Sequence, residues 1–148
     1  MDKLVELNKA YKEIKRIKKL RGYEYGKSDC WTLFCIYDRN TNKLNNLYGM
    51  ITEYKTHITF HKLIEKAGYK DAKDLILANG YKEVSFDDLQ IGDVCVFDSI
   101  VVDYTIAIYN GEVWVNSSDS EKYEKLPSRF VIPRARYLVR LEEKNEKI

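Results

Sequence analysis

Cys30 is the residue best placed to do chemistry in this sequence of 148 residues. It follows Asp29, in a segment where Gly26 allows a tight turn and Ser28 or Asp29 can cap a helix that begins near Cys30. A cysteine attacks as the thiolate, and the unpaired N–H groups and dipole of a helix N-terminus lower the pKa of a thiol there. The same position also suits a small core residue. Both interpretations stay open on the local sequence alone.

A nucleophilic cysteine needs a base, normally a histidine that is oriented by a third polar group. The histidines of the chain are His57 and His61, four residues apart in a predicted helix. This spacing is that of a metal-ligand pair, but no zinc-peptidase pattern of Glu, Asp or Cys surrounds them. We expect both to be solvated or hydrogen-bonded to neighbours, with recruitment of either as the base for Cys30 as the alternative.

The three cysteines, Cys30, Cys35 and Cys95, do not form an even disulfide framework. Cys30 and Cys35 lie five residues apart with no further ligand cluster nearby, which argues against a zinc site. The sequence therefore predicts neither a metal nor a cofactor.

The length predicts one domain with a single core. A net charge of +2 gives no general argument for nucleic-acid binding, although residues 1–22 hold eight Lys or Arg against three acidic residues. No apolar run approaches the roughly 18 residues of a membrane span, and the N-terminus lacks a signal-peptide core. We expect synthesis in the cytoplasm. The 12 tyrosines are more than a core requires and suit interfaces.

The first half of the chain has helical periodicity. Apolar residues spaced by three and four predict an amphipathic helix over 3–20, whose basic face is either solvated or in contact with an acidic partner. A second, largely apolar helix is predicted from Cys30 to just before Asp38. Two shorter helices are predicted over 57–67 and 71–79.

In the second half of the chain, polar and apolar residues alternate as they do in strands. Strands are predicted over 94–97, 104–109 and 113–116, the last two joined at Asn110-Gly111, with a final strand within 131–141. Helices followed by an antiparallel sheet make an α+β fold, in which a central Cys-bearing helix packs on the C-terminal sheet. We divide the chain into a basic helix (1–22), an α+β domain (23–141) and a charged tail (142–148), within one domain overall.

Three short motifs occur in order. They are Tyr25-Gly26-x-x-Asp29-Cys30, then Ile91-Gly92-Asp93-Val94-x-Val96-Phe97, then Ile106-Ala107-Ile108-Tyr109-Asn110-Gly111. This layout resembles the NlpC family of papain-like cysteine hydrolases, over about residues 23–118, and is most similar to a branch found among tailed-phage proteins. In that family an Asp-Cys pair begins the central helix, a Gly-Asp pair opens the first strand, and the catalytic histidine begins the next strand.

The resemblance implies a histidine where this chain has Thr105, and a threonine hydroxyl is not a general base near neutral pH. The residue that would orient the histidine is expected on the strand after the Asn110-Gly111 turn, where Asn116 or Ser117 is the nearest polar candidate. The candidate site is therefore Cys30, vestigial or nucleophilic, with Asp29, Thr105 and Asn116.

The sequence leaves three functional hypotheses open. The first is a structural or assembly protein of a tailed-phage virion, tail-associated, with a degenerate NlpC-like fold that contacts other phage structural proteins. The second is an active cysteine hydrolase, a peptidoglycan endopeptidase or amidase that uses Cys30 with an atypical base. The third is a binding protein directed at a host defence or regulatory target.

Overall fold

The computed structural model describes residues 2–42, 47, 51, 54–98 and 105–142. Its helices are α1 (Lys3–Arg21), α2 (Cys30–Thr41), α4 (His57–Lys66), α5 (Ala72–Ala78) and α6 (Ser128–Val131). Its strands are β1 (Tyr81–Glu83), β2 (Val94–Phe97), β3 (Thr105–Tyr109), β4 (Trp114–Val115), β5 (Lys125–Leu126) and β6 (Ala135–Leu141). Short 3-10 turns cover Phe86–Asp88, Glu121–Tyr123 and Ile132–Arg134.

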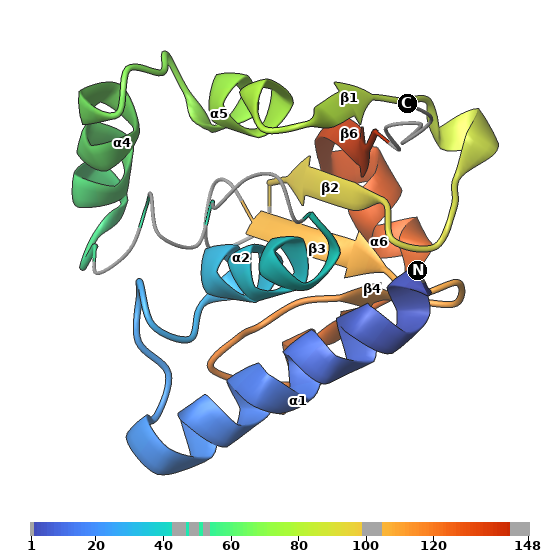
Figure 1. The fold of residues 1–148 in the computed structure, drawn as a ribbon. Coiled ribbons are helices and arrows are strands. Elements are labelled where there is room, and N and C mark those ends of the chain that lie inside the picture. Colours follow the sequence, from blue (N-terminus) through green and yellow to red (C-terminus); the bar gives the residue numbers. More distant parts are fainter. Residues whose placement is uncertain (1, 43–46, 48–50, 52–53, 99–104, 143–148) are drawn as a thin grey trace, which may run out of the picture.

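The strands form one antiparallel sheet in the order β1-β6-β2-β3-β4-β5. The helices α1 and α2 lie side by side against this sheet, as Figure 1 shows, and α6 lies beside its C-terminal strands. The expected α+β arrangement of N-terminal helices and a C-terminal antiparallel sheet is confirmed. None of the helices in the described part of the chain is long and apolar enough to cross a membrane.

Each face of the sheet has its own core. Val94 and Val96 of β2 point toward the helices and pack in one cluster with Leu33 and Ile36 of α2. The intervening residues point to the opposite face, where a second cluster forms around Trp114; its other buried members are Cys95, Phe97, Ala107, Leu126, Val131 and Leu138. Because both faces are covered, β2 is buried at every position.

Helix α2 is longer than the sequence predicts. It continues through Asp38 to Thr41, whereas its end was expected before Asp38. The Asp38 carboxylate is fully buried and accepts hydrogen bonds from the Tyr81 hydroxyl (2.8 Å) and from Asn42 Nδ2 (3.1 Å). The prediction was wrong because these polar side chains find their partners inside the protein, so they do not end the helix.

The hairpin between β3 and β4 is also wider than expected. Tyr109 pairs with Trp114, so four residues form the loop, and the strand predicted over 113–116 is only Trp114–Val115. The Asn110 side chain accepts from the backbone N–H groups of Glu112 and Val113, which stabilises the longer loop. Tyr104, predicted as the first residue of β3, lies outside the described residues, as does the tail from residue 143.

The Gly-Asp pair that opens β2 has a packing role and an electrostatic role. Gly92 has a φ of +94°, and a Cβ there would lie 2.6 Å from both the Tyr37 hydroxyl and Lys3 Cδ. Asp93 is fully buried and forms a two-pronged ion pair with Arg140 of β6, at 2.7 and 2.8 Å. These contacts hold the start of β2 against β6 and against the helices α1 and α2.

Candidate functional site

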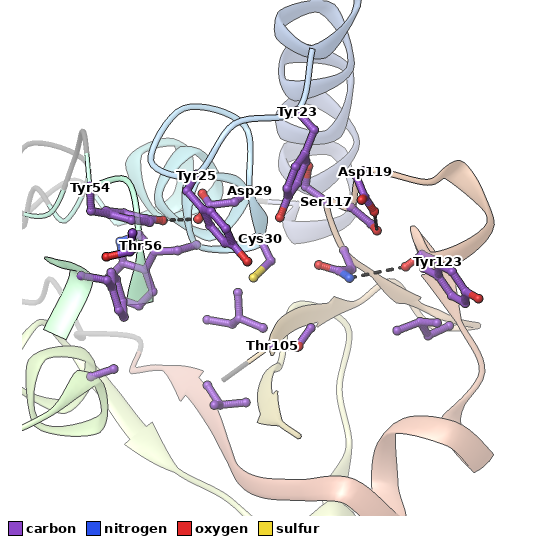
Figure 2. Close-up of a pocket in the computed structure, with 18 of the residues that line it drawn as sticks. Tyr23, Tyr25, Asp29, Cys30, Tyr54, Thr56, Thr105, Ser117, Asp119 and Tyr123 are labelled. Carbon is purple, nitrogen blue, oxygen red and sulfur yellow. Dashed lines mark hydrogen bonds between the residues drawn. The ribbon is translucent and has the colours of Figure 1, made fainter. Parts of the chain in front are cut away.

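A pocket of about 440 Å³ lies where the start of α2 meets the sheet. Cys30 and Thr105 both border it, and Figure 2 shows them facing the same cavity. Its lining combines aromatic residues with a few polar ones: Tyr23, Tyr25, Asp29, Cys30, Trp31, Tyr54, Thr56, Phe60, Ala72, Val96, Thr105, Ile106, Asn116, Ser117, Ser118, Asp119, Tyr123, Leu126 and Phe130. The tertiary fold thus brings all four residues of the predicted site to one cavity.

Cys30 is the first residue of α2, as predicted, and Asp29 is the cap before it. Its surroundings nevertheless favour the protonated thiol. Desolvation by burial, and next the charge of Asp29, raise the pKa of Cys30 to about 12, while hydrogen bonds from the backbone N–H groups of Ile106, Trp31 and Cys30 itself lower it less. The depression of the pKa that a helix start favours is therefore outweighed by the apolar surroundings and the adjacent carboxylate.

Asp29 is a structural cap with no free carboxylate oxygen. Only 3% of it is exposed, and its Oδ1 accepts from the backbone N–H of Thr32 (3.1 Å) and from the Thr32 hydroxyl (2.5 Å). Its Oδ2 accepts from the hydroxyl of Tyr54, the bond drawn in Figure 2. Asp29 thus fixes the first turn of α2 and ties it to the segment before α4.

Thr105 is the first residue of β3, and the next residue, Ile106, donates its N–H to the Cys30 sulfur. This contact places the start of β3 directly against the thiol. The position that the NlpC resemblance assigns to a histidine is thus next to Cys30, and a hydroxyl group that cannot serve as a general base occupies it.

Asn116 and Ser117 follow β4 and border the same pocket. The Asn116 backbone N–H donates to Glu124 O (2.8 Å), and its Nδ2 donates to Tyr123 O (3.4 Å). The Ser117 hydroxyl donates to Ser28 O (2.5 Å), which joins this segment to the loop before Cys30. Both polar candidates therefore lie near the Cys30–Thr105 pair.

His61 is not brought to Cys30 in the described structure. His61 lies half-buried on α4 with its ring 5.6 Å from that of Phe60, and it is not among the described residues that line the pocket. The side chain of His57 lies outside the description. Among the residues described, no three His, Cys, Asp or Glu side chains are grouped as metal ligands.

Two lysines of the basic helix find acidic partners within the chain. Lys15 and Lys18 of α1 both bind the carboxylate of Glu124, which is 1% exposed, and Lys15 also binds Glu121 at 2.7 Å. Lys18 further donates to the backbone oxygen of Ser118 in the pocket wall (2.9 Å). This network joins positions about 100 residues apart and so could not be predicted from local sequence; it holds the segment after β4 against α1.

The pocket is rich in aromatic side chains, which was not predicted from the sequence. Trp31 packs edge-to-face on Phe60 with ring centroids 5.1 Å apart, and Tyr54 on Phe60 at 4.9 Å. Tyr25 and Tyr123 are 37% and 50% exposed at its rim. The high tyrosine count was the signal, but it did not indicate where these rings would gather.

The comparisons with known proteins add a family. A search of curated proteins found no match. A family model described as "Domain of unknown function (DUF6950)" matches residues 6–128, well over half of the chain. The matched region includes most of α1, all of α2 and β3, and the segment after β4, and so contains every residue of the predicted site. The chain belongs to the DUF6950 family.

Proposed function

We propose that this chain is a non-catalytic structural or assembly protein of a tailed-phage particle, tail-associated and built on a degenerate NlpC-like papain fold. It acts through contacts with other subunits rather than by turnover. The observation that carries the proposal is the Cys30–Thr105 pair. The thiol has a raised pKa, and a threonine stands where the base would be.

A cysteine hydrolase needs a thiolate and a group that accepts and returns protons. The described residues that line the pocket include no Lys, Arg or His to stabilise a thiolate by charge. Removing the base from a catalytic triad costs several orders of magnitude in rate. The pocket is therefore better suited to binding than to hydrolysis.

Three placements support the NlpC-like part of the proposal. Cys30 begins a buried helix, Thr105 begins the strand against it, and Asn116 follows the next strand. This is the order of nucleophile, base and orienting residue that the resemblance implies. The proposed protein thus has the architecture of the NlpC family without its hydrolase activity.

Surface features support protein contacts. Leu20 and Ile58 are 78% and 69% exposed, and the exposed tyrosines Tyr25 and Tyr123 flank the pocket. On α1, four basic residues remain exposed on one face; they are Lys9, Lys12, Arg16 and Lys19. Aromatic residues and arginine are enriched where proteins dock, so the exposed tyrosines and Arg16 fit a subunit of an assembly.

The test has two parts. We expect mass spectrometry of purified particles, from a phage whose genome encodes this chain, to find the protein in stoichiometric amounts, and deletion of its gene to block particle assembly. We expect the purified protein to leave cell-wall peptides intact. A monomeric protein that cleaves these peptides, and loses this activity in Cys30→Ala, would contradict the proposal.

The second candidate is an active cysteine hydrolase that acts on peptidoglycan peptides or another amide. Its favouring observation is the set of backbone N–H groups, from Cys30, Trp31 and Ile106, that surround the sulfur and favour its anionic form. If this candidate is right, Cys30 reacts selectively with a thiol probe near pH 6, ahead of Cys35 and Cys95.

A further inference from the structure

The pocket at the start of α2 carries negative charge that no basic side chain balances. Asp29 and Asp119 both line it, and neither forms an ion pair in the described structure. The described lining residues include no Lys, Arg or His. Lys18, the α1 lysine that reaches this wall, gives its amine to Glu124 and to the carbonyl oxygen of Ser118 instead. A cation that enters the pocket therefore meets attraction and no competing charge.

The two carboxylates differ in what their oxygens contact. Both oxygens of Asp29 accept hydrogen bonds, from Thr32 and from Tyr54, which is the pattern of an ionised carboxylate because that form has acceptors alone. The N-terminus of α2 offsets this charge by only about half a unit. Asp119 is exposed at the rim, where the Ser118 hydroxyl donates to it at 3.3 Å. One negative charge thus lies inside the pocket and one at its mouth.

Two tyrosine rings lie close to these charges. The rings of Tyr23 and Tyr25 are 6.1 Å apart and inclined at 65°, and Figure 2 shows both side chains extending toward Cys30. Burial, followed by the negative charges of neighbours that include Asp29 and Asp119, raises the pKa of both phenols. The face of an aromatic ring is itself negative. This part of the pocket therefore favours positive charge.

Other rings of the lining already hold a cation of the chain. The guanidinium of Arg134 lies 4.1 Å from the ring centre of Phe130, and the amine of Lys122 lies 5.5 Å from that of Tyr123. Neither basic residue lines the cavity. No Lys or Arg of the described part of the chain lies over Tyr23 in this way. The ring of Tyr23 can therefore contact a cation from outside the chain.

The lining favours one chemical class of cation. A metal ion needs several oxygen, nitrogen or sulfur ligands, and the described residues hold no such group. A primary ammonium has three N–H donors to satisfy, whereas the buried oxygens of Asp29 already accept three hydrogen bonds. An alkylated ammonium has no such demand and is the cation that aromatic pockets recognise. The volume of about 440 Å³ lies within the range of roughly 300–1,000 Å³ typical of small-molecule sites.

We propose that the pocket is a binding site for an alkylated ammonium cation, such as a trimethylammonium group, which contacts the rings of Tyr23 and Tyr25 and is balanced by Asp29 and Asp119. A free small molecule and a trimethylated lysine side chain both present this group. The site goes beyond the virion role proposed above and does not depend on it.

A pair of probes that differ in charge alone tests the site. Choline carries a trimethylammonium group, and 3,3-dimethylbutan-1-ol has the same shape with carbon in place of nitrogen. We would titrate the ¹⁵N-labelled full chain with each at constant ionic strength and follow the amide signals by NMR. Choline should shift the signals of Tyr25 and Asp119 with a dissociation constant on the order of 1 mM, and the alcohol should bind about tenfold more weakly. The signal of Arg16, on the outer face of α1, should stay in place.

Two matched pairs of variants separate the ring from the carboxylate. Asp119→Asn should weaken choline binding about two- to fivefold and leave the alcohol unaffected, whereas Asp119→Glu should bind choline as the wild type does. Tyr23→Leu should weaken choline binding about three- to tenfold, whereas Tyr23→Phe, which keeps the ring, should not. If Tyr23→Leu fails to fold, the two probes and the Asp119 variants still decide the matter.

Equal affinity of the wild-type chain for choline and the alcohol would overturn the inference, as would an Asp119→Asn variant that binds choline as tightly as the wild type. A third probe, Nα-acetyl-trimethyllysine N-methylamide, identifies the source of the group. Affinity tenfold above that of choline would assign it to a methylated side chain of a partner, and affinity below that of choline to a free small molecule. If unmethylated Nα-acetyllysine N-methylamide binds as tightly as its trimethylated form, the proposed class of cation is wrong.

Discussion

The raised pKa of Cys30 predicts a slow rate of alkylation at this cysteine, which can be measured. Burial and the charge of Asp29 raise this pKa from an ordinary value of 9.0 to about 12, a difference of three units. At neutral pH this lowers the thiolate fraction about a thousandfold. A more basic thiolate is also more nucleophilic, with a Brønsted coefficient of about 0.4–0.5, which recovers about 15- to 30-fold. Alkylation of Cys30 at pH 7 should therefore be about 30- to 60-fold slower than that of an unperturbed cysteine.

The assay is a series of short iodoacetamide pulses between pH 6 and pH 10, followed by peptide mass spectrometry. The folded chain should show a Cys30 rate that rises tenfold per pH unit with no plateau in this range, because the group stays protonated below its pKa. Cys95, whose pKa burial also raises to about 12, is the internal comparison. In guanidinium chloride all three cysteines should react at equal rates, with a plateau above pH 9.

A plateau of the Cys30 rate near pH 6 or 7 would refute this reasoning. It would mean that the backbone N–H groups of Ile106 and Trp31 outweigh desolvation, and it would favour the active hydrolase. Rapid labelling of Cys30 together with the buried Cys35 would instead report local unfolding of α2.

Three substitutions and one control substitution test, by urea denaturation, the contacts that hold β2 and the pocket wall. Gly92→Ala should lower the free energy of unfolding by about 2–4 kcal/mol, because it combines backbone strain with overpacking. Gly68→Ala is the control, since the φ of Gly68 is also positive (+96°) but a Cβ there meets nothing within 4 Å, and it should cost about 1–2 kcal/mol. Equal losses of stability in the two variants would show that overpacking at Gly92 contributes nothing. Arg140→Met should cost about 3–5 kcal/mol, since it leaves the fully buried Asp93 without its ion partner, and a loss under 1 kcal/mol would show that this partner is dispensable. Glu124→Leu should cost about 1–3 kcal/mol, because it leaves the amines of two α1 lysines without their buried acceptor. An unchanged midpoint of urea unfolding would show that these ion pairs do not stabilise the pocket wall.

The helices followed from sequence because their signals are local. The spacing of apolar residues predicted α1 to within a residue, and of the two caps expected for the helix of Cys30, Ser28 or Asp29, the structure has Asp29. The end of α2 was missed because the Asp38 carboxylate is stabilised by Tyr81, which lies 43 positions along the chain. No local pattern encodes such a partner.

The short strands were harder to predict for a related reason. β2 was found because its apolar run is continuous, but β1 and the two-residue β5 were missed. Their pairing depends on neighbours that are brought near by the sheet, such as β6 for β1 and β4 for β5. Strand propensity over two or three residues is too weak to show this in advance.

For the site, the sequence by itself determined which groups exist: a cysteine after an aspartate at a helix start, and a threonine where the NlpC resemblance implies a histidine. It did not determine how the cysteine ionises, because desolvation and the charge of Asp29 depend on what surrounds the thiol in three dimensions. Nor did it show that Trp31 and Asn116 lack partners, since hydrogen-bond satisfaction is a property of packed neighbours. The residue types set the chemistry that is available, and the tertiary structure decided that the surroundings of Cys30 raise the pKa of its thiol.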